Sequence, residues 1–286
     1  MSRAGLPQRL LYRTRTGAVL LRLLTAPRLS KWAGRFCDSP LSKGLIRPFA
    51  RRNRIDVGAC RRRAFWSFND FFTRQLQPGA RPFAQTPGCL QSPADGCVSA
   101  YRIDPSSRFC IKRIEYSLEA LLRDPALARR YEGGTCCILR LAPAHYHRFA
   151  YVDGGVKGKN VRIEGRLHTV RPIAYERHAV PVENTREYCV ICTEQFGQVV
   201  QMEVGAMLVG RIVNYRTGIG RVERGEEKGL FEFGGSTVLL LFERGRAELQ
   251  PRFFAETARG REIFVHMGEA IGSAPPQGGV QASNAP

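Results

Sequence analysis

The sequence predicts an α+β protein, in which a helical, basic N-terminal region precedes a compact β-rich core of sandwich or barrel-like type. Up to about residue 87, apolar residues recur at helical spacing among arginines, whereas beyond it short apolar runs alternate with glycines. The chain has 286 residues, of which 43% are apolar and 24% charged, so it can build one substantial hydrophobic core and does not have the composition of a disordered protein.

The N-terminal region, 1–87, carries most of the charge. The chain has 44 basic and 25 acidic residues, and residues 1–63 alone hold sixteen basic against two acidic ones. As helices, Leu10–Leu24 and Leu41–Arg52 have one apolar and one basic face, and a serine caps a third helix, Ser67–Leu76. No apolar run reaches the ~18 uncharged residues that a spanning helix needs. We expect a region that binds an anionic membrane surface without crossing it, with an organelle-targeting peptide as the alternative.

Residues 88–273 are predicted to form the β-rich domain, after three prolines that break the chain into turns. One helical insert, Ser117–Arg129, interrupts the strands, and the Pro-, Gly- and Ser-rich residues 274–286 are predicted to be a disordered tail. The strands are expected at Cys97–Arg102, Cys136–Leu141, Tyr188–Thr193, Gln198–Val204, Leu208–Tyr215, Thr237–Phe242 and Glu262–Met267.

The nine cysteines form no disulfide framework, because their number is odd and most have apolar neighbours. The pair Cys189 and Cys192 has a spacing used in zinc and redox sites. It lies inside a β-branched run without a second pair, however, and this favours strand packing. We expect reduced thiols and no metal.

A Gly-Gly-Ser-Thr turn lies between a Phe-rich segment and a Val-Leu strand within Gly229–Phe242. By itself the pattern fits a glycine turn that joins two buried strands. It also fits a self-processing site, because glycines at 234 and 235 permit unusual backbone angles and leave the Gly235 carbonyl open to the Ser236 hydroxyl. Attack there converts the amide into an ester, and elimination leaves a dehydroalanine that hydrolyses to a pyruvoyl group.

A serine needs a base to take its proton. His145 and His147 lie in Ala-His-Tyr-His-Arg-Phe, and His168 lies in Gly-Arg-Leu-His-Thr-Val. Asp95, in Ser-Pro-Ala-Asp-Gly, could orient such a histidine. Taken singly, each of these residues also fits a structural role, and Asp95 fits an ordinary turn. The two histidines to which we assign only a structural role are His178 and His266.

Taken together, these motifs resemble the phosphatidylserine decarboxylase family, and above all its bacterial members, over about residues 10–270. They occur in the order found in that family. The motifs that carry the resemblance are Ser92-Pro-Ala-Asp-Gly96, His145-Tyr-His-Arg-Phe149, Val204-Gly-Ala206, Val209-Gly210, Phe233-Gly-Gly-Ser-Thr237, Ser67-Phe-Asn-Asp-Phe-Phe-Thr-Arg74, Gly165–Pro172, Val182-Glu-Asn-Thr-Arg-Glu187 and Arg224-Gly-Glu-Glu-Lys-Gly229.

The resemblance implies a pyruvoyl-dependent enzyme that decarboxylates phosphatidylserine to phosphatidylethanolamine in phospholipid biosynthesis. Ser236 matches the serine that becomes the pyruvoyl cofactor, which forms a Schiff base with the substrate amine. Cleavage between Gly235 and Ser236 would give a large chain, 1–235, and a small chain, 236–286. These would associate as a heterodimer, or as a higher oligomer, at the cytoplasmic side of the cell membrane, as a peripheral protein.

The resemblance also assigns roles near this serine. Asp95 matches the family's charge-relay aspartate, and His147 matches the histidine of the Tyr-His-Arg motif, which is suited to protonate the product. Many relatives carry a second histidine three residues later, which serves as the base for self-cleavage. This chain has Ala150 there, so either His147 serves both steps or His168 takes the missing role.

Two other classes of protein remain as alternatives. A β-rich carrier or binding module of the phosphocarrier or lipoyl type would use similar strand-turn segments, but no lipoylation turn is visible and the Gly-Gly-Ser-Thr segment would have no role. Nucleic-acid binding by the basic region is disfavoured, because the region has few aromatic residues for base stacking and no recognised motif.

Overall fold

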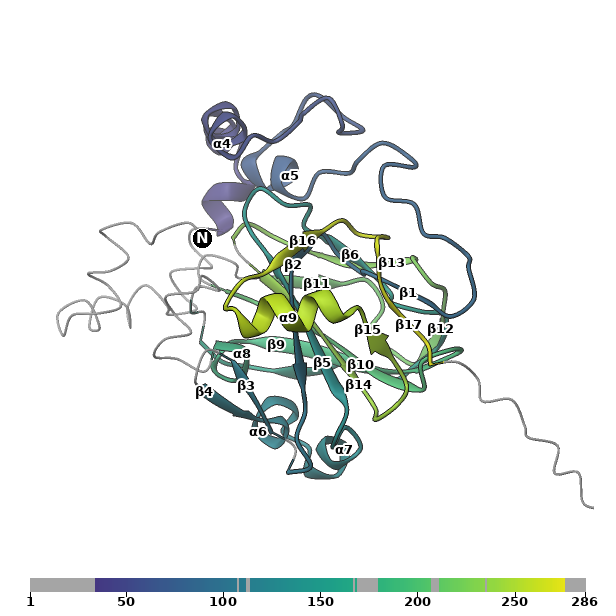
Figure 1. Cartoon of the computed structure of the whole chain (residues 1–286). Helices are drawn as coiled ribbons and strands as arrows, with labels where there is room; N and C mark the ends of the chain where they lie inside the picture. The colour runs from purple at the N-terminus through teal and green to yellow at the C-terminus, as the bar shows by residue number, and fades with distance from the viewer. Residues whose placement is uncertain are drawn as a thin grey trace, which may run out of the picture.

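The computed structural model in Figure 1 describes most of the chain. The predicted helix Leu10–Leu24 and nearly all of the predicted tail, 274–286, lie outside the described residues. The described residues are 34–106, 108–111, 114–166, 168, 180–206, 211–234 and 236–275.

Short helices make up the described part of the N-terminal region. After a helical turn at 34–38, the 3-10 helix η1 (Pro40–Leu45) leads into α4 (Ile46–Asn53), so the helix predicted over these residues is divided in two. α5 (Phe68–Phe72) is shorter than predicted. Its cap is confirmed, because the Ser67 hydroxyl accepts a hydrogen bond from the Asp70 N–H at 3.1 Å.

A nine-stranded antiparallel sheet forms the centre of the molecule. Its middle strand, β14, is buried at every residue and pairs with β10 on one side and with β5 on the other. In order, the strands are Gly220–Val222 (β12), Gly155–Lys157 (β7), Arg186–Thr193 (β9), Gln198–Val204 (β10), Ser236–Phe242 (β14), Thr135–Leu141 (β5), Gly96–Arg102 (β2) and Ile263–Val265 (β16), with Val161–Ile163 (β8) beside β9.

Smaller elements cover one face of this sheet. One three-stranded sheet contains Ile212–Asn214 (β11), Glu227–Phe231 (β13) and Arg148–Ala150 (β6), and another contains Cys89–Gln91 (β1), Ala270–Ser273 (β17) and Glu248–Leu249 (β15). Helix α9 (Pro251–Ala258), which the sequence pattern did not predict, lies on the same side (Figure 1). A single hydrophobic cluster joins these elements to the large sheet through Leu240, Phe231, Ile271 and Phe253.

The opposite face of the sheet is covered by the predicted helical insert. The insert forms two short helices, α6 (Leu118–Leu122) and α7 (Pro125–Arg129). A third short helix, α8 (Val180–Glu183), contacts α6. The hairpin of β3 (Arg108–Ile111) and β4 (Ile114–Ser117) directly precedes α6. Because successive side chains of a strand point to opposite faces, β14 contributes Leu239 to the core on this side and Leu240 to the core on the other. This explains why its pattern is apolar throughout.

The α+β class with a β-rich core is therefore confirmed. The expected alternative of a barrel is wrong for the described strands, since the edge strands β12 and β16 do not pair with each other and the large sheet stays open. The sheets are instead stacked in layers around two apolar cores.

Phenylalanines attach the N-terminal helices to the sheets. Phe68, Phe72 and Phe49 surround Phe233, which lies between β13 and β14, with ring centroids 4.8, 5.3 and 6.2 Å from the Phe233 ring. Such ring pairs each contribute about 1 kcal/mol beyond their buried area. The N-terminal helices are therefore held against the glycine turn that the sequence singled out.

Within the described ranges, no helix is long and apolar enough to cross a membrane. The eight cysteines whose side chains the structure describes, all but Cys110, are free thiols. Cys189 is buried in β9, whose interior raises the pKa of its thiol by desolvation, whereas Cys192 is exposed. The two side chains thus do not lie together as a ligand pair.

Candidate active site

The glycine turn joins two separately anchored stretches of chain. Upstream, the Phe233 N–H donates to the side-chain oxygen of Asn69 at 3.0 Å, which ties the turn to α5. Downstream, Ser236 begins β14 and pairs with Leu141 of β5. Gly234 has a φ of 136°, a backbone conformation that residues with a side chain rarely adopt. Gly235 lies outside the described residues.

Ser236 is fully buried, and its hydroxyl has no hydrogen-bond partner among the described residues. By strand alternation its side chain shares a face with Val238 and Leu240, the face covered by β13 and β6. A buried hydroxyl without a partner is costly, so natural proteins keep one only rarely. The Ser236 hydroxyl is therefore held by no other group of the described chain.

His147 lies directly before β6, next to the strand that leads into the turn, and its carbonyl accepts the Phe231 N–H at 2.9 Å. Its ring is fully buried against Phe72, with centroids 4.1 Å apart, and Phe72 in turn contacts Phe233. Phe72 therefore contacts both His147 and the phenylalanine that precedes the glycine turn.

The protonation of His147 follows from its contacts. Its Nδ1 lies 2.9 Å from the His145 carbonyl, so Nδ1 carries the proton and donates it, and Nε2 keeps a lone pair. Nε2 is buried and has no partner in the described part of the chain. Burial, and next the positive charge of Arg74, lower the pKa of His147 to about 3. The ring is thus a neutral base with its accepting nitrogen unoccupied.

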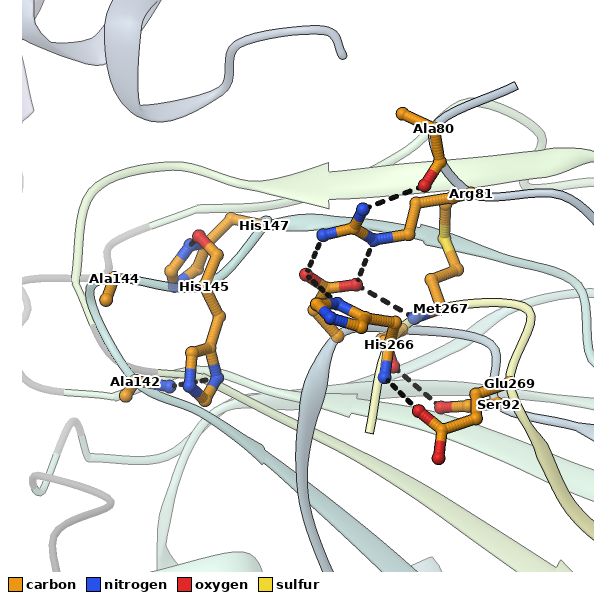
Figure 2. A network of polar contacts seen from close by, with 12 residues as sticks. Ala80, Arg81, Ser92, Ala142, Ala144, His145, His147, His266, Met267 and Glu269 are labelled. Carbon is orange, nitrogen blue, oxygen red and sulfur yellow. Dashed lines mark hydrogen bonds and ion pairs between the residues drawn. The ribbon is translucent and has the colours of Figure 1, made fainter. Parts of the chain in front are cut away.

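Asp95 is buried and ion-paired, but with an arginine. Arg81 donates from Nε and from a terminal nitrogen to the two carboxylate oxygens, both at 2.7 Å, and the Met267 N–H donates at 2.8 Å. His266 Nδ1 lies 3.6 Å from the same carboxylate. Burial raises the pKa of Asp95, but these hydrogen bonds outweigh it and the pKa lies below the usual value. Figure 2 shows this network with His147 and His145 nearby.

The register of the large sheet locates Asp95 relative to the serine. Ser236, Leu141 and Gly96 lie in one row across β14, β5 and β2, since Ser236 pairs with Leu141 and Cys97 with Arg140. Asp95 comes one residue before that row, at the same end of the sheet. Two strand spacings separate its backbone from that of Ser236, or ~10 Å. Asp95 has no hydrogen bond to His147 or His168 among the contacts of the described residues.

His168 lies on the other side of the serine. Asn184 accepts the His168 N–H at 2.9 Å and donates to the carbonyls of His168 and Gly205 at 2.9 and 2.7 Å. Gly205 follows Val204, the residue of β10 that pairs with Thr237. The imidazole is buried, and its Nε2 lies 3.1 Å from a Glu183 carboxylate oxygen. His168 and Glu183 thus form a histidine–carboxylate pair beside the strand that carries Ser236.

Position 150, where the second histidine of the family is expected, is occupied by a buried alanine in β6. The Ala150 N–H donates to the Pro93 carbonyl at 2.8 Å, and Phe149 forms a bridge with Ala94. A side chain at 150 would therefore project from a strand that borders the Asp95 segment. In this chain that position offers only a methyl group.

Sequence reasoning missed four residues of this region: the partners Arg81 and His266 of Asp95, the anchor Asn69, and the buried Arg74. For Arg74 and Asn69 a signal existed, because both are polar residues inside the Phe-rich stretch Ser67–Leu76. For Arg81 and His266 no local signal existed. Their role comes from a contact with a residue distant in the sequence.

Comparison with known proteins points to one family. A family model described as phosphatidylserine decarboxylase matches residues 68–273. Proteins named phosphatidylserine decarboxylase proenzyme from Clostridium perfringens strain SM101 and Ruminiclostridium cellulolyticum are each 41% identical, over 266 and 270 residues. The alignments cover 91 and 92% of this chain and 90 and 89% of those proteins. A protein of Clostridium acetobutylicum named phosphatidylserine decarboxylase proenzyme 2 is 41% identical over 92% of this chain and 90% of its own. These matches do not favour the carrier-module alternative.

Proposed function

The chain belongs to the phosphatidylserine decarboxylase family, and from this premise we propose that it cleaves itself between Gly235 and Ser236 and then decarboxylates phosphatidylserine to phosphatidylethanolamine. The observation that carries the proposal is the buried Ser236 hydroxyl without a partner in the described chain, placed after a glycine with a φ of 136°. The names of the relatives agree with it, since a proenzyme is a precursor that requires maturation.

His147 is the proposed base for this cleavage. Its Nε2 has a lone pair and no partner in the described region, and its ring contacts Phe72, which in turn contacts Phe233 before the turn. Asp95 acts on it electrostatically: its negative charge raises the pKa of His147 and so favours the imidazolium that proton transfer would create. His168, with Glu183 as its carboxylate, is the second candidate, supported by its place beside β10.

The proposed cleavage proceeds through an ester between Gly235 and the Ser236 hydroxyl. The Gly235 acyl group moves from the Ser236 nitrogen to Oγ, and elimination then takes the Ser236 Cα proton and expels the Gly235 carboxylate. One water converts the remaining dehydroalanine into a pyruvoyl group and releases ammonia. The products are a large chain, 1–235, and a small chain, 236–286, held together as a heterodimer because β14 stays paired with β10 and β5.

The residues around position 236 fit a pyruvoyl group. The serine from which it would form is already buried, and it has no hydrogen bond in the described chain that its conversion would break. Such a group supplies a ketone that captures the substrate amine and an electron sink for the bond to the departing carboxylate. The backbone of β14 would hold it, and His147 Nε2, which is unprotonated at neutral pH, could accept a proton and return it.

The substrate is a lipid, so the site must meet a membrane. We place the protein at the cytoplasmic face of the cell membrane as a peripheral protein. Of the nine large apolar side chains that the described chain exposes, four belong to the N-terminal helices and the loop before α5. They are Phe36, Leu41, Leu45 and Trp66, the most exposed being Leu41 at 84% and Trp66 at 70%.

A Ser236→Ala variant tests the proposal. The wild-type protein should separate on a denaturing gel into two chains, and the mass of the small chain should show a blocked pyruvoyl end. Ser236→Ala should remain a single chain and release no carbon dioxide from carboxyl-labelled phosphatidylserine. Ser99→Ala, which removes another buried hydroxyl in β2, is the matched control and should mature normally. An intact 286-residue chain with full activity would exclude the mechanism.

A further inference from the structure

Arg74 is a buried arginine whose hydrogen bonds are incomplete. It is 5% exposed, and its terminal nitrogens donate at 3.2 to 3.4 Å to the carbonyls of Phe72, Ala144 and His145. Its Nε is buried and has no partner among the described residues. Burial lowers the pKa of the guanidinium, as expected for a charge removed from water.

Other arginines of the protein have the hydrogen-bond partners that Arg74 lacks. Arg81 and Arg224 each lie within 2.8 Å of an aspartate oxygen. Arg186, fully buried like Arg74 and likewise without a carboxylate partner in the described chain, donates four bonds of 2.5 to 3.0 Å to carbonyls. Arg74 has neither the carboxylate nor the short bonds. A buried charge is costly without a partner, so this guanidinium is suited to receive an anion.

The place of Arg74 tells which anion it can receive. The His145 carbonyl accepts from both Arg74 and His147 Nδ1, so the guanidinium lies beside the candidate base. On the other side, Arg74 follows α5, whose start is next to the exposed Trp66. Arg74 therefore lies beside the candidate base and, along the chain, eight residues after Trp66 of the proposed membrane surface. In a phospholipid, the phosphodiester connects the acyl chains to the reacting head group.

We propose that Arg74 binds the phosphodiester of the lipid substrate and so determines specificity for a phospholipid head group over free serine. The inference rests on the proposed function. An arginine forms paired, charge-assisted hydrogen bonds with phosphate oxygens, and its Nε with one terminal nitrogen provides that geometry. The substrate carboxylate is the less suitable ligand, because a cation bound to it would oppose its departure as carbon dioxide.

The phosphodiester is present before, during and after decarboxylation. Binding it therefore stabilises substrate and transition state alike, which lowers KM and leaves kcat almost unchanged. Arg74→Gln should raise KM for phosphatidylserine in detergent micelles about tenfold or more, the loss expected for a charge-assisted hydrogen bond. Arg74→Lys keeps the charge without the paired geometry and should raise KM by a smaller factor. Arg224→Gln removes an arginine of similar burial and should leave KM unchanged.

Soluble head groups identify the anion. Glycerophosphoethanolamine, which has the phosphodiester and no carboxylate, should inhibit the wild type and inhibit Arg74→Gln at least about tenfold less well. Serine methyl ester, which lacks the phosphate, should affect both equally.

Two results would overturn the proposal. One is equal inhibition of both enzymes by glycerophosphoethanolamine. The other is a fall in kcat at constant KM, which would make Arg74 only a positioning residue for His147. If Arg74→Gln does not mature, Arg74→Lys carries the same test. A wild type without decarboxylase activity would instead refute the proposed function.

Discussion

At the scale of single residues, the site depends on polar atoms that are buried and left without partners in the described chain. Ser236 Oγ and His147 Nε2 are both of this kind, whereas Asp95 is saturated by Arg81 and the Met267 N–H. Such atoms also occur elsewhere in the described chain, for example at Thr237 and Tyr131, so what distinguishes Ser236 is its place directly after the glycine turn. The saturated carboxylate, by contrast, can influence His147 through its charge without touching it.

The pKa of His147 leads to a test of the base. With a pKa of about 3, the ring stays neutral throughout the physiological range, and its accepting nitrogen is always available. Self-cleavage of freshly translated chain should therefore be nearly independent of pH from about 8 down to about 5 and should decrease only as the pH approaches the folded pKa, where protonation blocks Nε2. The rate can be followed on denaturing gels.

The same assay separates the two histidines. His147→Ala should abolish cleavage, and His168→Ala should still cleave. The reverse result would assign the base to His168 and Glu183.

At the scale of elements, α5 and β14 hold the two sides of the proposed cleavage site. β14 is fixed by strand pairs on both sides along its whole length, while the upstream side depends on a five-residue helix and its aromatic contacts. A helix this short does not persist alone in water, so its position comes from packing and from the Ser67 cap. The turn between them can therefore be cut without either anchor unfolding.

Asn69 on α5 is the sharpest test of this arrangement. Asn69→Ala removes the acceptor of the Phe233 N–H and also a donor to the Asp38 carboxylate. It should slow self-cleavage several-fold and lower the free energy of unfolding by about 2 to 4 kcal/mol. Cleavage time courses and urea unfolding of the Ser236→Ala background measure the two effects separately. Thr73→Ala, which removes a hydroxyl bonded to the Asn69 carbonyl, serves as the control for damage to the helix end. Unchanged cleavage in Asn69→Ala would show that the turn needs no anchor at α5.

At the scale of the whole molecule, the N-terminal region of the sequence combines most of the net charge with exposed apolar side chains. The chain has a net charge of +19, and residues 1–63 account for +14 of it. The exposed Leu41 and Trp66 belong to the helical unit that also packs on Phe233. The proposed membrane surface and the proposed cleavage site therefore share one structural unit, as an enzyme acting on a lipid requires.

A double variant tests this surface. Leu41→Ser with Trp66→Ser should reduce sedimentation with phosphatidylserine vesicles at least about fivefold, because each removes ~1.5–3 kcal/mol of apolar contact if fully buried in lipid and less if partly so. Self-cleavage should be unaffected, since neither side chain contacts the turn. Ile219→Ser, at a comparably exposed residue (77%) in another loop, is the control. Equal binding by the double variant and its parent, at low and high salt, would exclude this surface as the membrane contact.

The sequence by itself determined the α+β class, the main strands, the capped helix at Ser67 and the family. These are encoded locally: strands by runs of β-branched residues, helix starts by capping serines, and the family by motifs of contiguous residues. Helix α9 was not predicted from the sequence, because it is short and only its Phe253 is fully buried. Its apolar face is defined by the sheet beneath it. The insert, expected as one helix, was divided at Arg123, which adopts a left-handed conformation.

Only the tertiary structure decided which groups of the site meet. Arg74 and the His145 carbonyl are 71 residues apart in sequence, and Asp95 and the Met267 N–H are 172 apart. Such contacts depend on strand register and on how the layers stack, which no local pattern specifies. For that reason the sequence could select Asp95, His147, His168 and Ser236 as candidates. It could not reveal that Asp95 is bound by Arg81, that His168 pairs with Glu183, or that Arg74 is buried without a carboxylate partner in the described chain.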